Sequence, residues 1–134
     1  MKLKIYSDGG ARGNPGPAAI GVVVCDETNK VICEYKDTIG EATNNVAEYL
    51  ALVAAYELAK EYKADEIAFH LDSELVVRQM RGEYKVKHEN MKKLYDEVKL
   101  SEHSVKTISY THLPREHEFM RKADRLVNRA LDGE

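Results

Sequence analysis

The apolar and polar positions in the first third of the chain follow the pattern of β-strands separated by turns. Polar and apolar residues alternate over 2–8, and a stretch rich in Gly and Pro follows over 9–17. Two runs rich in β-branched residues, 18–25 and 31–39, flank a polar turn at 26–30. This pattern predicts one strand followed by a hairpin.

From residue 44 or 45 the apolar positions repeat with the period of a helix, which continues to residue 62. Thr43 and Asn44 are both suitable N-caps for this helix. The same patterns predict strands at 66–72 and 105–113, and helices at 73–80, 88–100 and 118–131. This order predicts one α/β domain over residues 1–134, with a mixed sheet that is antiparallel first and parallel where helices intervene.

Composition and charge narrow the class of protein. The 134 residues are 43% hydrophobic and 32% charged, which is typical of a folded globular domain. No apolar run approaches the roughly 20 residues that span a bilayer, so we expect a cytoplasmic protein without membrane contact. We also expect a monomer. The formal net charge of −3 argues against a partner that is bound by phosphate neutralisation alone.

Two cysteines, Cys25 and Cys33, flank the predicted hairpin turn. Their spacing does not fit a zinc site, and two cysteines are too few for a secreted disulfide framework. They could lie close to each other across the two strands. The sequence therefore leaves open whether they form a disulfide or pack as small hydrophobic side chains.

Glu48 occupies an unexpected place in the predicted helix over 44–62. With about 100° of rotation per residue, it falls at the centre of the apolar face formed by Leu52, Ala55 and Ala59. Burying an ionised carboxylate without a partner costs several kcal/mol, so Glu48 requires a tertiary partner. A Lys or Arg from a neighbouring element would supply one, and so would a metal ion.

Three further carboxylates occupy positions where ligands are often bound. Asp8 and Asp72 each end an alternating strand, and open α/β sheets place their ligands at strand ends beside changes of strand order. Asp124 borders the core stripe of the helix predicted over 118–131. Each has a structural alternative, because Asp8 could form a turn, Asp72 could cap the next helix and Asp124 could face solvent.

Carboxylates that converge at one sheet edge raise each other's pKa, and divalent cations relieve this repulsion. A ligand set made only of carboxylate oxygens suits Mg²⁺ or Mn²⁺ rather than zinc. Two such ions about 3.5 to 4 Å apart are the usual device for in-line attack at phosphorus. The four carboxylates together therefore indicate phosphodiester hydrolysis.

Four motifs resemble, in their order and spacing, those of the type 1 ribonuclease H family, and the resemblance extends over essentially the whole chain. The motifs are IYSDGG at 5–10 with GNPG at 13–16, TNNVAEY at 43–49, DSELV at 72–76 and ADRLVN at 123–128. The resemblance implies a ribonuclease H-like α/β fold, with a five-stranded mixed sheet and helices on both faces. It also implies that two Mg²⁺ or Mn²⁺ ions are bound by four catalytic carboxylates, Asp8, Glu48, Asp72 and Asp124.

The activity implied by the resemblance is endonucleolytic hydrolysis of the RNA strand of an RNA/DNA hybrid, which leaves 5′-phosphate and 3′-hydroxyl ends. The alternative is a module of the same fold that binds hybrids or double-stranded RNA without catalysis. Intact carboxylates favour the enzyme, because simple binding does not call for an acidic cluster that faces phosphates.

Small and amide side chains near the carboxylates suit contact with a nucleic-acid backbone, where 2′-hydroxyl groups distinguish RNA from DNA. These candidate substrate-binding residues are Gly9, Gly10, Asn14, Thr43, Asn44 and Asn45. Glu74, a further candidate, stands where relatives often have Gln. The basic stretch Arg78–Lys93, which includes Lys85 and Lys87, is either a phosphate track or a solvated helix face.

The loop before Asp124 carries candidates for a residue that assists proton transfer or product release. The resemblance implies such a helper, because many relatives have a flexible His in this loop. Here His117 is the nearer candidate, and Arg115 could act instead by electrostatics. His112, at the end of a predicted strand, fits a structural role.

Overall fold

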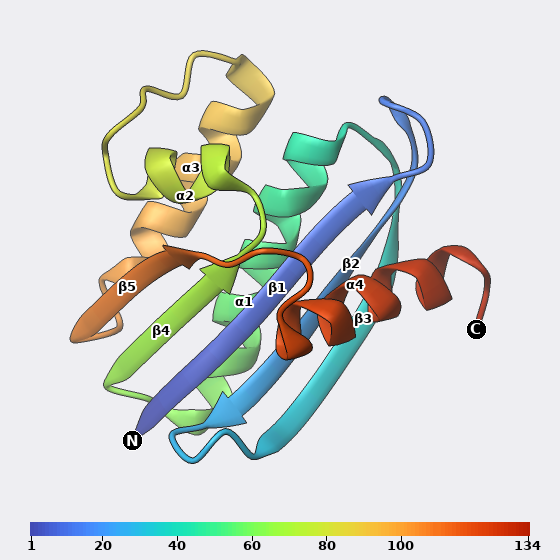
Figure 1. The fold of residues 1–134 in the computed structure, drawn as a ribbon. Coiled ribbons are helices and arrows are strands. Elements are labelled where there is room, and N and C mark those ends of the chain that lie inside the picture. Colours follow the sequence, from blue (N-terminus) through green and yellow to red (C-terminus); the bar gives the residue numbers. More distant parts are fainter.

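The computed structural model describes residues 1–134, and its secondary structure follows the predicted order (Figure 1). The elements are β1 (Lys2–Ala11), β2 (Gly16–Asp26), β3 (Val31–Ala42), α1 (Asn44–Tyr62), β4 (Glu66–Leu71), α2 (Glu74–Met80), α3 (Glu89–Glu102), β5 (Thr107–His112) and α4 (Glu118–Leu131). None of the helices has both the length and the apolar character needed to cross a membrane.

The five strands form one mixed sheet in the order β3-β2-β1-β4-β5. β2 runs antiparallel to β1 and β3, whereas β4 runs parallel to β1 and β5. Strands joined by short turns are thus antiparallel and strands separated by helices are parallel, as the element order predicts. The predicted five-stranded α/β fold is confirmed.

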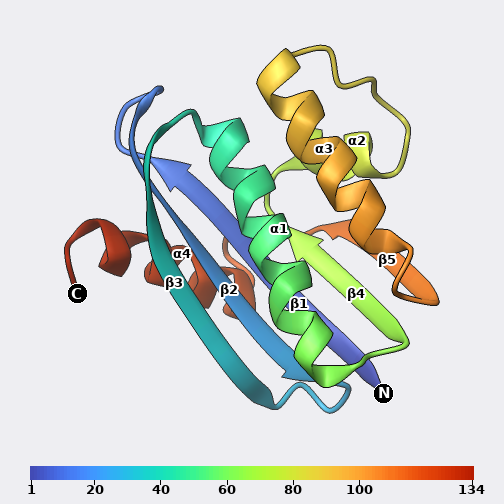
Figure 2. The same ribbon diagram turned by 180° about the vertical axis from the view of Figure 1, so that it is seen from behind.

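Helices cover both faces of this sheet (Figures 1 and 2). α1 lies along the middle of one face with α2 and α3 on the β5 side of it, and α4 lies across the opposite face. The larger core, on the α1 face, contains 19 buried residues, among them Ile5 and Phe69. A smaller core under α4 includes Tyr6 and Met120. Neighbouring residues of β1 therefore enter different cores, and this strand is buried on both faces.

β1 is longer than predicted, and this changes the surroundings of Asp8. Its pairing with β4 ends at Ser7, which lies opposite Leu71, but its pairing with β2 continues to Ala11. Asp8 is therefore a strand residue at the point where β1 extends past β4, and the alternative of a turn former is wrong. The turn predicted over 9–17 shortens to 12–15.

The remaining differences lie at the ends of elements. β2 and β3 pair as far as Gly16 opposite Ala42, so both strands are longer than predicted, and bulges interrupt their register. β5 is shorter than predicted and covers only Thr107–His112. The Thr43 hydroxyl accepts a hydrogen bond from the Val46 N–H, which identifies Thr43 as the N-cap of α1.

Cys25 and Cys33 are free thiols on opposite faces of the sheet. Cys25 packs in the core under α4, whereas Cys33 lies opposite Val24 in the β2–β3 ladder and packs against the core on the α1 face. Because alternate side chains of a strand point to opposite faces, the two sulfur atoms cannot meet. The disulfide alternative is wrong, and both cysteines pack as small hydrophobic side chains.

Candidate active site

The backbone of α1 touches β1 at Gly9. A Cβ on this glycine would lie 2.2 Å from the carbonyl oxygen of Ala47, so no larger residue fits without a shift of the helix. This approach places Glu48, the next residue of α1, against the strand. Oε1 of Glu48 accepts a hydrogen bond of 2.9 Å from the Gly9 N–H. The missing side chain thus allows a helix carboxylate to lie beside Asp8 of the strand.

A second glycine has the same role on the other face of the sheet. Gly21 lies opposite Asp8 in the β1–β2 ladder, and a Cβ there would lie 2.4 Å from the carbonyl oxygen of Ala123. α4 therefore packs directly on β2, and this contact brings Asp124 to the same edge of the sheet. Close packing on both faces assembles carboxylates from one strand and two helices.

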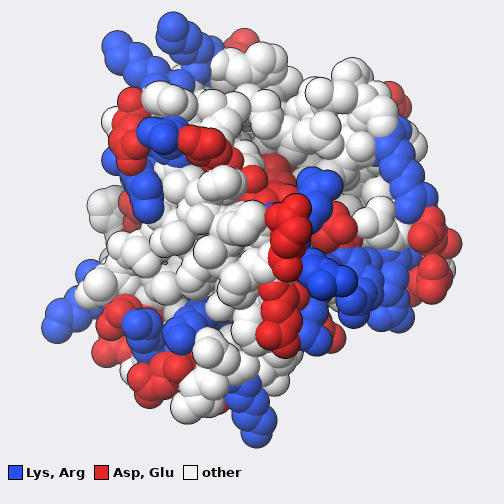
Figure 3. All heavy atoms as spheres, viewed as in Figure 1, with Lys and Arg blue, Asp and Glu red and all other residues white.

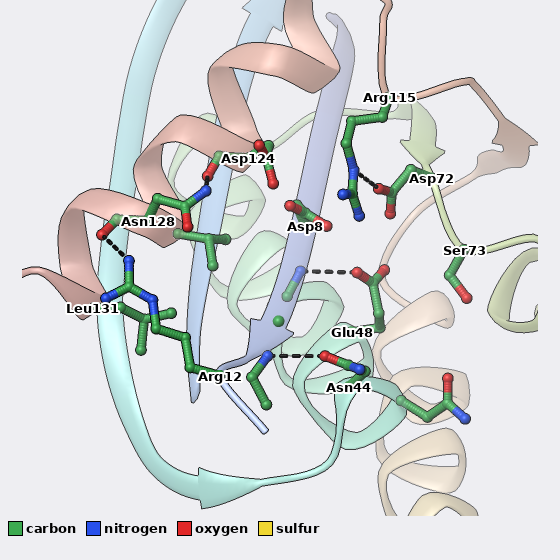
Figure 4. Close-up of a pocket in the computed structure, with 15 residues that line it drawn as sticks. Asp8, Arg12, Asn44, Glu48, Asp72, Ser73, Arg115, Asp124, Asn128 and Leu131 are labelled. Atoms are coloured by element: carbon green, nitrogen blue, oxygen red, sulfur yellow. Dashed lines mark hydrogen bonds and ion pairs between the residues drawn. The ribbon is translucent and has the colours of Figure 1, made fainter. Parts of the chain in front are cut away.

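Asp8, Glu48 and Asp72 form a carboxylate cluster at this edge (Figure 4). One carboxylate oxygen from each lies within 4.8 Å of the others. Asp8 is 3% exposed and Glu48 is 5% exposed, whereas Asp72 is partly exposed. Asp124 lies outside this cluster but lines the same pocket, which has a volume of about 560 Å³. The structure thus brings the four predicted carboxylates to one pocket.

Asp72 is held by its neighbours and does not cap a helix. The N-cap of α2 is Ser73, whose hydroxyl accepts a hydrogen bond from the Val76 N–H. One Asp72 carboxylate oxygen accepts a hydrogen bond of 3.2 Å from Nε of Arg115. The Asp72 backbone carbonyl accepts one of 3.1 Å from Nε2 of His112, which fits a structural role for that histidine. The alternative of Asp72 as an N-cap is wrong.

Burial and mutual repulsion oppose ionisation of the cluster. Burial raises the pKa of Asp8 to about 7, with smaller contributions from the charges of Asp72 and Asp124. Burial, followed by the charge of Asp8, raises the pKa of Glu48 well above its usual value. Neither Asp8 nor Glu48 forms an ion pair with a Lys, Arg or His. The ion pair at this cluster joins Arg115 to Asp72. The Lys or Arg partner that the sequence allowed for Glu48 is absent.

The carboxylate cluster fits a hard divalent cation. Its possible ligand atoms are all oxygens, which Mg²⁺ and Mn²⁺ prefer. Oε2 of Glu48 is buried and has no hydrogen-bond partner. A bound cation would supply this partner, and its charge would lower the pKa of the surrounding carboxylates.

Comparison with known proteins places the chain in a family. Residues 6–130 match the family described as reverse transcriptase-like. The crystal structure of RNase H1 from the archaeon Halobacterium salinarum superposes on the chain with a TM-score of 0.94, at 38% identity and with 100% of both chains covered. The chain belongs to the ribonuclease H family.

Two other members are similarly close in structure. The N-terminal RNase H domain of a Mycobacterium tuberculosis protein is 44% identical, with a TM-score of 0.93 over 98% of this chain and 100% of that one. LC11-RNase H1, isolated from compost by a metagenomic approach, was solved in complex with an RNA/DNA hybrid. It is 44% identical, with a TM-score of 0.91 over 98% of this chain and 97% of that one.

The chain spans less than two thirds of the length of two curated relatives. It is 46% identical to the bifunctional protein of M. tuberculosis over 99% of its own residues, but it spans only 36% of that protein. It spans 65% of the ribonuclease HI of H. salinarum, to which it is 39% identical over 98% of its residues.

The residues predicted near the carboxylates form the rim of the pocket. Those that line it are Gly9, Gly10, Asn44 and Asn45. Asn14 is outside the lining, and its Oδ1 accepts a hydrogen bond of 3.0 Å from the Asn44 N–H. Oδ1 of Asn44 in turn accepts one of 2.9 Å from the Ala11 N–H. These bonds tie the turn after β1 to the start of α1, where Thr43 serves as the cap.

The predicted basic stretch does not line this pocket. Arg78, Lys85 and Lys87 all lie outside the lining, and so does Glu74. Nε of Arg78 pairs with Glu74 at 2.9 Å, and Nη1 of Arg78 pairs with Glu83 at 3.0 Å. The charge of Arg78 is thus already compensated on the helix surface, in agreement with the alternative of a solvated helix face for this residue.

The two candidates for the helper role occupy different places. His117 is the N-cap of α4, where its Nδ1 accepts a hydrogen bond of 3.3 Å from the Phe119 N–H, and its ring stacks on Tyr6. Arg115 lines the pocket, and its guanidinium extends toward Asp72 (Figure 4). The structure therefore brings Arg115, and not His117, to the carboxylates.

Three polar lining residues, Arg12, Ser73 and Asn128, are not predicted from the sequence as site residues. Asn128 lies four residues after Asp124 on α4 and donates a hydrogen bond of 3.0 Å to the Asp124 carbonyl. This helical spacing is a signal that could identify it. Arg12 pairs with Asp132 at 2.7 Å, a contact between distant segments that no local pattern indicates.

Proposed function

We propose that this domain is a divalent-metal-dependent endoribonuclease that hydrolyses the RNA strand of RNA/DNA hybrids, leaving 5′-phosphate and 3′-hydroxyl ends. The observation that carries the proposal is the carboxylate cluster of Asp8, Glu48 and Asp72, with Asp124 in the same pocket. The hybrid-bound structure of LC11-RNase H1, at 44% identity, supports the same substrate.

Asp8, Glu48, Asp72 and Asp124 would hold two Mg²⁺ or Mn²⁺ ions. Such ions, when bound, activate the attacking water and stabilise the leaving oxygen at phosphorus. The protein orients three of these carboxylates through different contacts. The Gly9 N–H fixes Glu48, the Arg115 guanidinium fixes Asp72, and close packing of α4 on β2 fixes Asp124. We infer that the ligands are oriented before the substrate arrives.

The rim of the pocket is suited to recognise a sugar-phosphate backbone. Asn44, Asn45 and Asn128 are exposed, and their amide groups can both donate and accept hydrogen bonds. Gly10 adds no side chain, so a strand can approach the backbone of β1 closely. Contacts with 2′-hydroxyl groups would select the RNA strand without reading bases, so we expect cleavage with little dependence on sequence.

Arg115 supplies a positive charge beside the cluster. One of its N–H groups is engaged by Asp72, and the remaining donors of the exposed guanidinium are available to a phosphate. We assign it the role of stabilising the charge that develops at the scissile phosphate. The His117 ring is engaged in capping and stacking, which leaves Arg115 as the better placed of the two helpers.

A cleavage assay tests the proposal directly. Wild-type protein with Mg²⁺ or Mn²⁺ should cut a labelled RNA/DNA hybrid, and the product ends can be read from their mobility and from phosphatase sensitivity. Asp72→Asn should abolish cutting. Asp96→Asn is a matched control, because Asp96 lies on the outer surface of α3 in an exposed pair with Lys92; it should cut like the wild type.

The same assay addresses the alternative of a non-catalytic binding module. Hybrid binding by the wild type without cleavage under any divalent ion would support that module and refute the enzyme. Equal cutting by wild type and Asp72→Asn would also refute the proposed site. Sedimentation would test the proposed monomer, and fractionation of cells would test the proposed cytoplasmic location.

A further inference from the structure

Helix α4 carries four cations that the fold leaves without ion pairs. They are Arg121, Lys122, Arg125 and Arg129. The ion pairs of the structure include none of them. In the stretch Arg78–Lys93, by contrast, Arg78, Arg81 and Lys92 have acidic partners, and only Lys85, Lys87 and Lys93 have none. Four unpaired cations thus share one helix on α4, whereas the three of the predicted stretch are divided between the α2–α3 loop and α3.

These cations lie beside the carboxylates. Asp124 and Asn128 line the active-site pocket from α4, and Arg121 and Arg125 are the exposed residues next to them around the helix. Figure 3 shows a basic patch over α4 on the same face of the molecule as the acidic groups of the active-site pocket. The patch is also hollowed, because Arg121, Lys122 and Arg125 line a shallow depression of about 330 Å³.

We propose that the outer face of α4, through Arg121 and Arg125, binds backbone phosphates of the RNA/DNA hybrid beyond the pocket where the strand is cut. This inference rests on the proposed function, since it extends the path of that substrate. Guanidinium groups present several donors in a fixed plane, and they bind phosphate oxygens in pairs. A strand that crosses Asp124 and continues along the same face would meet these two residues next.

The fold itself has no other use for these two side chains. Arg129 lies in the last turn of α4, where a cation stabilises the helix dipole. Arg121 and Arg125 lie outside that turn, are exposed and make no side-chain hydrogen bond within the protein. Glu116 and Glu118 line the same depression and repel phosphate where they stand. This arrangement favours a contact along the arginine stripe.

The proposal resolves the difficulty raised by the acidic net charge. A protein of formal charge −3 can bind a polyanion if its cations gather along the binding path and its anions gather elsewhere or at a metal site. Each phosphate contact adds about 0.9 to the slope of log affinity against log salt concentration. The arginine pair should therefore contribute a slope of about 2.

The test compares two variants that lose the same charge. Arg121→Gln/Arg125→Gln removes the proposed contact, and Lys63→Gln/Lys106→Gln removes two unpaired cations at the opposite end of the parallel strands. Each is made in the Asp72→Asn background, so that a fluorescein-labelled hybrid is bound but not cut. Anisotropy titrations are run at several salt concentrations, and circular dichroism melting verifies the fold.

We expect the arginine pair, and not the lysine pair, to change the salt dependence. Between about 50 and about 200 mM salt, the parent should lose about ten times more affinity than Arg121→Gln/Arg125→Gln. With Asp72 restored, the arginine variant should show a raised KM and an unchanged kcat. Equal salt slopes for parent and arginine variant, or an equal effect of the lysine pair, would overturn the proposal. Absence of cleavage by the wild type would instead overturn the proposed function.

Discussion

The carbonyl oxygen of Ala47 lies 2.2 Å from the position that a Cβ on Gly9 would occupy. Strand β1 and helix α1 are thus in backbone contact at the point where Asp8 and Glu48 meet. The same glycine donates its N–H to Glu48. Assembly of the carboxylate cluster therefore depends on the absence of one methyl group.

Gly9→Ala should damage both the fold and the site. The added methyl group must push α1 away from β1, and overpacking of this kind destabilises proteins by about 1 to 3 kcal/mol. A displacement of Glu48 by about 1 Å should reduce cleavage roughly a hundredfold. Urea denaturation and single-turnover cleavage would measure the two effects.

Gly10→Ala is the control for stability, because its Cβ would approach only Val127 Cγ1, at an ordinary 3.7 Å. Its free energy of unfolding should stay within about 0.5 kcal/mol of the wild type. Equal stabilities of the two variants would contradict the view that Gly9 sets the separation of β1 and α1.

The sequence predicted the elements and their order because the apolar periods of 2 and 3.6 follow the buried faces directly. It failed at Gly9 and Gly10, where local composition indicated a turn but pairing with β2 keeps the chain extended. Glu48 was identifiable because a carboxylate at the centre of an apolar face requires a partner.

Contacts between side chains of distant segments could not be predicted from the sequence. The pair between Arg12 and Asp132 depends on how the β1–β2 turn meets the end of α4. Arg78 differs, because its partners Glu74 and Glu83 are only four and five residues away, and the sequence left open whether it binds phosphate or lies on a solvated helix face. Charge runs in a sequence do not reveal which charges the fold has already compensated.

The raised pKa values of the cluster predict that the metal-free protein gains stability as pH falls. Burial raises the pKa of Asp8 to about 7 in the folded chain, against about 4 when unfolded. The folded state therefore binds protons more tightly, and the gain is complete below about pH 4 and lost as pH rises through about 7. Thermal melts in EDTA between these values should show the trend.

Asp8→Asn isolates this contribution. A neutral amide cannot be charged, so in EDTA at pH 8 the variant should be more stable than the wild type, by on the order of 2 to 4 kcal/mol. The advantage should shrink toward pH 5, where the wild-type Asp8 is protonated. A constant difference across this range, or a less stable variant at pH 8, would argue against electrostatic strain at Asp8.

Two serines provide a contrast in hydrogen bonding. Ser7 is 1% exposed and its hydroxyl has no partner, whereas the Ser73 hydroxyl caps α2. Ser7→Ala removes a buried group that gains nothing in the fold, so stability should be unchanged or higher by about 1 kcal/mol. Ser73→Ala should lose about 1 kcal/mol. Urea titration gives both values, and a reversed order would show that Ser7 has a partner in solution.

The roles of Arg115 and His117 in cleavage can be distinguished by substitutions that leave the fold intact. Arg115→Ala removes the guanidinium beside Asp72, so kcat for hybrid cleavage should fall by about 10- to 100-fold. Arg115→Lys should recover only part of the lost kcat, because a lysine lacks the planar donor pair. His117→Asn removes the imidazole but keeps a side chain that caps helices well, so stability and kcat should both remain near wild type. A larger fall in kcat for His117→Asn than for Arg115→Ala, with both variants fully folded, would reassign the helper role to the histidine.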